Sequence, residues 1–101
     1  MSANGVTMRP DGAAEVSGEL TFATVPAYLQ RNGALFAGSG DLVIDLQGVT
    51  RADSAGVALL VEWLRLARAA GRTVRYRNLP SQVEALIRVS GLEKAFALEA
   101  Q

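Results

Sequence analysis

The feature that most limits the possible folds is a short apolar run followed closely by a long helical pattern. Residues 41–46 read Asp-Leu-Val-Ile-Asp-Leu, a β-branched apolar stretch typical of a strand in the centre of a sheet. After a predicted loop over 48–53, apolar residues from Ser54 to Ala70 recur at helical spacing, and Gly71 ends the pattern. A buried strand that leads into a long helix predicts an α/β fold with parallel strand pairing.

Shorter predicted elements flank this unit on both sides. Before it we expect a hairpin of residues 5–8 and 14–17 around the turn Pro10-Asp11-Gly12, then a helix from Thr24 that Gly38-Ser39-Gly40 ends. After it we expect a strand over 73–77, a helix over 82–90, and a tail over 92–98 with room for an edge strand. The sequence therefore predicts one domain over residues 1–101, with about three to four helices on a small mixed β-sheet.

The composition excludes most common enzyme chemistries. The chain contains no cysteine and no histidine, which removes disulfides, thiolate and imidazole metal sites, and Cys or His catalysis. Ten Lys and Arg residues balance ten Asp and Glu residues, and the arginine-rich stretch offers no set of aromatic residues as a base-stacking platform, so nucleic-acid binding is not expected. We expect a protein that is not an enzyme and that needs no cofactor.

The sequence also bears on where the protein resides. Residues 1–8 show no basic leader followed by an apolar stretch, so no signal peptide is predicted. The most apolar window, residues 55–70, is interrupted by Glu62, Arg65 and Arg68 and is too polar to span a bilayer. We expect a cytoplasmic protein.

Three aspartates lie near one another along the predicted strand and loop: Asp41, Asp45 and Asp53. In an α/β fold such carboxylates could hold Mg²⁺, and a small metal-dependent enzyme is the hypothesis that follows. The alternative is that Asp45 holds the loop through hydrogen bonds to backbone N–H groups. We favour this structural role and predict no metal site.

Asp53 and Ser54 begin the long helix and admit two interpretations. Both residue types are preferred N-caps, because their side-chain oxygens accept hydrogen bonds from unpaired helix amides. Alternatively, Ser54 is an exposed hydroxyl at a helix N-terminus, where a phosphate would meet free N–H groups and the positive end of the dipole. Phosphorylation would add a charge of about −1.5 to −2 beside Asp53, so the modified state could also repel a partner.

The long helix also carries a candidate partner-binding surface. At about 100° per residue, four apolar side chains should cover the sheet, namely Val57, Leu60, Leu64 and Ala67. Trp63 lies in a flanking band and is either buried in the core or part of an exposed patch. That patch would consist of Ser54, Ala55, Leu59, Glu62 and Trp63. The small residues Ala55, Gly56 and Ala58 would let another backbone approach closely.

Residues 65–88 carry six arginines against one acidic residue, Glu84. Such an excess could face an acidic partner or lipid head groups. We favour a solvated face, because strand alternation places Arg75 and Arg77 on one side of an outer strand, where charges protect the edge.

The segment Leu42–Leu60, which reads LVIDLQGVTRADSAGVALL, resembles the signature of STAS domains. This family includes the anti-sigma-factor antagonists and the cytoplasmic domains of sulfate transporters. The resemblance extends over the opening hairpin, the Gly18-Glu19-Leu20 step and the late segment Leu86–Leu92. It implies the STAS fold, and it makes Ser54, which follows Asp53 at the helix start, the regulatory position of the family.

Two branches of the family compete. Residues 57–72 and the following Asn78-Leu79-Pro80 are similar to the MlaB branch, chiefly through Glu62-Trp63. That similarity implies a cytoplasmic STAS subunit of a phospholipid ABC transporter that maintains outer-membrane lipid asymmetry. Its partner would be the MlaF-like ATPase subunit, within a complex with a membrane permease, so the chain would be peripheral to the inner membrane.

The competing branch, the anti-sigma-factor antagonists, implies an anti-sigma serine kinase as the partner and regulation by phosphorylation of Ser54. Its members often read Asp-Ser-Ser-Gly where this chain has Asp-Ser-Ala-Gly at residues 53–56. We therefore expect an MlaB-like adaptor. The residues expected to bind the partner are Asp53, Ser54, Ala55, Gly56, Leu59, Glu62 and Trp63.

Overall fold

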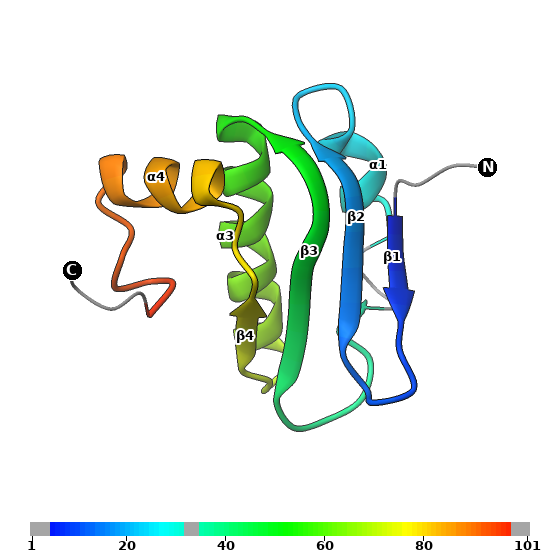
Figure 1. The fold of residues 1–101 in the computed structure, drawn as a ribbon. Helices are drawn as coiled ribbons and strands as arrows, with labels where there is room; N and C mark the ends of the chain where they lie inside the picture. The colour runs from blue at the N-terminus through cyan, green and yellow to red at the C-terminus, as the bar shows by residue number, and fades with distance from the viewer. Residues whose placement is uncertain (1–4, 32–34, 98–101) are drawn as a thin grey trace.

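In the part of the chain that the structure describes, four strands form one sheet in the order in which they occur along the sequence. The computed structural model describes residues 5–31 and 35–97. The strands are β1 (Gly5–Met8), β2 (Ala14–Leu20), β3 (Leu42–Ala52) and β4 (Val74–Arg77) (Figure 1). The β1–β2 pair is antiparallel and the β2–β3 and β3–β4 pairs are parallel, which confirms the predicted opening hairpin and mixed sheet.

Three helices are described in these residues: α1 (Val25–Leu29), α3 (Ser54–Ala69) and α4 (Ser81–Val89). Helices α1 and α3 lie on the same face of the sheet (Figure 1), where the ring of Tyr28 packs edge-on against Trp63 with centroids 6.2 Å apart. Helix α4 lies beyond the carboxyl end of β4, beside the start of α3 and across the strand direction (Figure 1). In the described part of the chain, the other face of the sheet carries no helix.

The core fills the space between the sheet and α3. Its buried side chains alternate along the strands and recur along the helix, and they include Val16, Leu20, Leu42, Ile44, Leu46, Val57, Leu60 and Ala67. Leu64, which was expected among them, is half-buried. The Tyr28 hydroxyl donates to the Ser17 carbonyl at 2.8 Å and accepts from the Gly5 amide at 3.1 Å, so the polar ends of the aromatic contacts have partners.

The prediction of a loop over residues 48–53 is wrong, because β3 continues to Ala52. Its second half pairs with β2 in a register that places Gly48 opposite Ser17 and Arg51 opposite Glu19. A Cβ atom on Gly48 would lie 2.9 Å from the Cβ of Ser17, so the glycine allows the two strands to approach here. The strand therefore delivers the chain directly to the start of α3.

The remaining expectations are met at most positions. The predicted strand over 73–77 and helix over 82–90 are β4 and α4, and Arg75 and Arg77 are exposed on the edge strand as expected. The helix from Thr24 is short, and its predicted continuation falls partly on residues 32–34, which lie outside the described residues. The expected edge strand after Leu92 is not found as far as Ala97, because residues 93–97 form turns, and Leu98 lies outside the described residues.

Candidate partner-binding site

The junction of β3 and α3 is organised by the carboxylate of Asp53. Its Oδ1 atom accepts hydrogen bonds from the Ala55 amide at 2.8 Å and the Gly56 amide at 3.4 Å, which caps the helix. Its Oδ2 atom accepts from the amide of Phe22 at 3.1 Å. The hydrogen bond from Phe22, followed by those from Ala55 and Gly56, holds the pKa of Asp53 below its usual range. One side chain therefore ties the start of α3 to the turn between β2 and α1.

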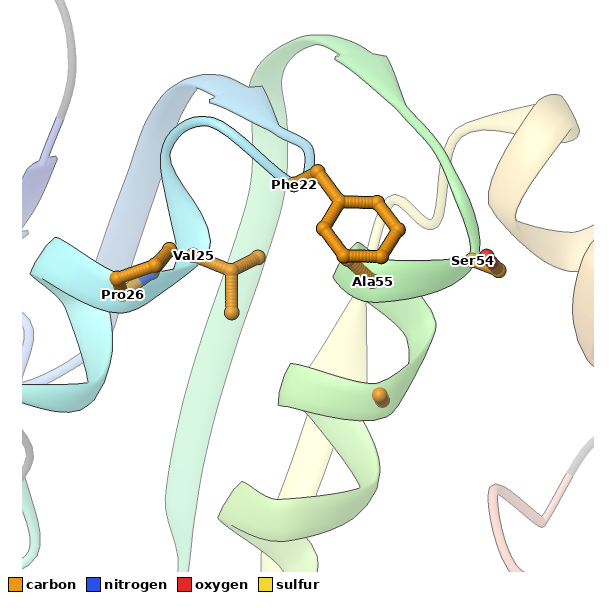
Figure 2. Close-up of a pocket in the computed structure, with 6 residues that line it drawn as sticks. Phe22, Val25, Pro26, Ser54 and Ala55 are labelled. Carbon is orange, nitrogen blue, oxygen red and sulfur yellow. The ribbon is translucent and has the colours of Figure 1, made fainter.

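A shallow apolar groove opens beside this junction. Phe22 reaches from the turn between β2 and α1 toward Ala55, and Val25 and Pro26 of α1 lie on the other side (Figure 2). The groove has a volume of about 420 Å³, and Ser54 and Ala58 complete its lining. The Phe22 side chain is 79% exposed although it is large and apolar. Exposed apolar patches on a soluble protein often mark interaction sites.

A second groove lies on the other side of Ser54, between the end of β3 and α4. Its volume is about 430 Å³, and it is lined by Ala52, Asp53, Ser54, Gln82, Ala85, Leu86 and Val89. The side chain of Val89 is 87% exposed at the end of α4. Ser54 is itself exposed and borders both grooves. The hydroxyl therefore stands between two apolar depressions.

Gly56 serves the chain's own packing. It is buried, and a Cβ atom added there would collide with the carbonyl oxygen of Leu20 and lie 2.9 Å from the Leu20 Cβ. The small side chain was expected to admit the backbone of a partner. The backbone that approaches is instead the end of β2, so Gly56 is no contact residue and is needed for α3 to lie against the sheet.

The expectation that Leu59 and Trp63 are exposed to a partner is wrong. Each of these side chains is only 1% exposed. Trp63 is buried because α1 packs onto the flank of α3, with Tyr28 against the indole ring. The alternative interpretation, burial of Trp63 in the core, is the one that the structure supports. The five residues of the predicted patch therefore do not share one surface.

Glu62 lies two turns beyond Ser54 and forms an ion pair with Arg65 of the same helix. Its carboxylate accepts two hydrogen bonds from Arg65, at 2.8 and 2.6 Å. These bonds lower the pKa of Glu62 and raise that of Arg65. Of the residues expected to bind a partner, only Ser54 and Ala55 line the first groove, and Asp53 and Ser54 line the second.

The three aspartates of the hypothetical magnesium site have separate surroundings. Asp45 is buried in the middle of β3 and accepts a hydrogen bond from the Gln47 amide at 2.9 Å, which confirms its bonding to backbone. Asp53 caps α3 and Asp41 is exposed ahead of β3. Across residues 5–31 and 35–97, no three acidic side chains come together in a group that could hold a metal ion.

Among the groove residues that the sequence did not predict, Phe22 and Val89 are the most exposed large apolar side chains. For Val89 a signal exists, because it follows the buried Ile87 by two positions and therefore points to the opposite side of a helix. For Phe22 no periodic signal exists, because the residue lies in a turn. The backbone of this turn is held by the hydrogen bond from the Phe22 amide to Asp53, which joins two segments far apart in the sequence.

Comparison with known proteins establishes the class. A family model described as "Mlab, STAS domain" matches residues 7–99, so the chain belongs to the STAS domain family. Within that class, the matching model is the one whose description carries the name Mlab. No protein of curated function matches the sequence significantly.

Solved structures share the fold. The chain is similar to the murine anion transporter Slc26a9, with a TM-score of 0.67 and 21% identity over 81% of this chain and 14% of that one. It is also similar to a sulfate transporter family protein from Wolinella succinogenes, with a TM-score of 0.64 and 14% identity over 83% of this chain and 69% of that one.

A third similar structure is the unphosphorylated anti-sigma factor antagonist SpoIIAA, with a TM-score of 0.61 and 18% identity over 83% of this chain and 80% of that one. At these identities the likeness establishes the STAS fold and carries no function. The helices of the described residues are too short or too polar to cross a bilayer.

Proposed function

We propose that the chain is a non-catalytic adaptor that binds the ATPase subunit of a phospholipid ABC transporter. The observation that carries the proposal is the surface around Ser54, where an exposed hydroxyl stands between two apolar grooves with Phe22 and Val89 at their rims. Exposed apolar patches of this kind mark protein interaction sites, and aromatic side chains dominate binding energies at such sites.

The match to the model described as "Mlab, STAS domain" supports the transporter branch. The lack of cysteine and histidine supports a role in binding, because the chain holds few groups suited to acid–base or nucleophilic chemistry. In this role the chain is cytoplasmic and meets the inner membrane only through its ATPase and permease partners. The bound nucleotide belongs to the partner.

The first test is purification of the tagged protein from its native host, with mass spectrometry of the partners and of the peptide that contains Ser54. The proposal predicts an ABC ATPase together with unmodified Ser54. The same experiment contradicts the proposal if no ATPase is recovered and a serine kinase is recovered instead.

The second test is the affinity of the purified ATPase for the Ser54→Arg variant. The arginine places bulk and charge between the two apolar grooves, so we expect binding to weaken about tenfold or more. Ser39→Arg is the matched control, because Ser39 is exposed in the loop before β3, at the opposite end of the strands. Equal affinities of both variants would show that the site is wrong.

A second candidate function is that of an anti-sigma-factor antagonist switched by phosphorylation of Ser54. The observation that favours it is the exposed Ser54 hydroxyl at the first position of a long helix, together with the fold shared with SpoIIAA. A phosphate there would lie at the positive end of the helix dipole. This function predicts a co-purifying serine kinase and a mass gain of one phosphate on the Ser54 peptide.

A further inference from the structure

The turn between β4 and α4 has an unusual backbone. β4 ends at Arg77 and α4 begins at Ser81, so Asn78, Leu79 and Pro80 form the whole connection. Asn78 has a φ angle of +59°, in the left-handed region that residues other than glycine rarely adopt. Pro80 precedes α4 without any side-chain capping bond. The conformation of Asn78 therefore sets the direction in which α4 leaves the sheet.

The buried carboxylate of Asp45, on the sheet face opposite α3, forms a hydrogen bond with this turn. The Nδ2 atom of Asn78 donates to Oδ1 of Asp45 at 3.0 Å, and Asp45 is 2% exposed. Oδ1 also accepts from the Gln47 amide, and Oδ2 accepts from Nη1 of Arg9 at 3.1 Å. Burial alone would raise the pKa of Asp45, but the bonds from Asn78, Gln47 and Arg9 outweigh it and hold the pKa below its usual range.

The position of α4 determines the second groove. One wall of that groove is the end of β3 with Ser54, and the other wall consists of α4 residues, among them Leu86 and Val89. The inner side of α4 is anchored by the fully buried Val83. A hydrogen bond of 3.3 Å from the Ala52 amide to Gln82 Oε1 joins the two walls. A change in the angle of α4 therefore changes the width of the groove.

We propose that Asp45 and Asn78 are positioning residues that set α4, and with it the second groove, from the sheet face that no described helix covers. Neither residue lines either groove, so their proposed effect on the groove is transmitted through α4. The consequence for binding rests on the proposed function, while the consequence for the position of α4 does not.

The main test variant is Asn78→Asp, which is isosteric and also tolerates the left-handed backbone. It replaces the donated hydrogen bond by two facing carboxylates. The groups around them are Arg9 and Asp11 from the β1–β2 turn, Glu15 of β2 and Arg77 of β4. Because two adjacent carboxylates share one proton as the pH falls, acid restores a donor at this position.

Two spin labels read the position of α4 without any partner. The chain has no cysteine, so the double variant Ser54→Cys, Val89→Cys accepts labels on the two exposed rims of the groove. With Asn78→Asp added, we expect a changed label-to-label distance at pH 8 that returns to the original value at acidic pH. With Asn78→Gly, which keeps the backbone conformation and lacks the donor, we expect a broadened distance distribution at every pH.

Affinity for the ATPase is the second readout, measured without labels. We expect Asn78→Asp to bind about tenfold more weakly at pH 8, which equals about 1.4 kcal/mol, and to recover at acidic pH. Ser39→Asp is the control, because Ser39 is exposed in the loop before β3 and lines neither groove, and it should bind like the wild type.

Unchanged label distances in folded Asn78→Asp and Asn78→Gly would overturn the positioning role. Changed distances with unchanged affinity would overturn the link to binding. If the unmodified chain does not bind the ATPase while the distances still change, the proposed function fails and the positioning role stands.

Discussion

The first turn of α3 and the middle of the same helix differ in what their side chains do. The first turn presents Ser54 and Ala55 beside the exposed ring of Phe22, so small side chains border an apolar groove. The middle carries Leu59 and Trp63, which are large and enclosed. The comparison teaches that one continuous helix borders an open groove at its start and closes the core further along, and that a large apolar side chain on a helix flank need not be exposed.

Removal of Trp63 tests the burial of the middle of α3 and has the largest expected effect. Trp63→Ala creates a cavity beneath α1 and should lower the free energy of unfolding by about 3–5 kcal/mol. Urea unfolding measures the loss, and the half-buried Leu66→Ala provides a control with a smaller effect. If the variant stays folded at low temperature, it should still bind the ATPase. A loss of stability below about 1 kcal/mol would contradict the assigned burial.

Removal of Phe22 tests the exposed surface beside the first turn of α3. It should reduce affinity for the ATPase and leave the free energy of unfolding nearly unchanged. Phe22→Ala should weaken binding to the ATPase by about 2 kcal/mol and change stability by less than about 0.5 kcal/mol, because the ring has few contacts to lose. Titration calorimetry and urea unfolding give the two values. Met8→Ala is the control, since Met8 is also exposed but lies on β1, outside both grooves. If Phe22→Ala lowered stability as much as it lowered affinity, the assignment of Phe22 to the exposed surface would be wrong.

Acid should weaken the cap at the start of α3, and this is the smallest of the expected effects. The pKa of Asp53 is lowered in the folded state, first by the amide of Phe22 and then by those of Ala55 and Gly56. Its contribution to stability is therefore present above the unfolded pKa of about 3.9 and is lost as the pH falls through the folded value. The urea midpoint should fall less between pH 5 and pH 2 in Asp53→Asn than in the wild type. An equal fall of the urea midpoint with pH in both proteins would contradict the stabilising role of the Asp53 carboxylate.

The order of the elements can be predicted from sequence because each carries a local signal. The β-branched run at 42–46, the turn at Pro10-Asp11-Gly12 and the glycine after the long helix all mark positions that the structure confirms. The extension of β3 to Ala52 has no such signal. Its exposed Thr50 and Arg51 read as a loop, although both belong to β3, and Arg51 pairs with Glu19 of β2.

The surface of the site is less predictable because it depends on contacts between distant segments. Helical periodicity places Trp63 on a flank, and only the packing of Tyr28 against it decides that the flank is interior. Ser54 and Asp53 can be recognised, since capping chemistry and the family resemblance both refer to local sequence. Phe22 and the groove along α4 require the tertiary arrangement.

The two oxygens of Asp53 serve different segments, and this affects how mutational data on the chain should be interpreted. Oδ1 holds the first amides of α3 and Oδ2 holds the backbone of Phe22. In an alanine scan that measures only affinity, Asp53→Ala could weaken binding in two indirect ways. It could fray the start of α3, or it could displace the ring of Phe22. Neither effect requires that the aspartate touch a partner, so a strong score at this position would not by itself map an interface.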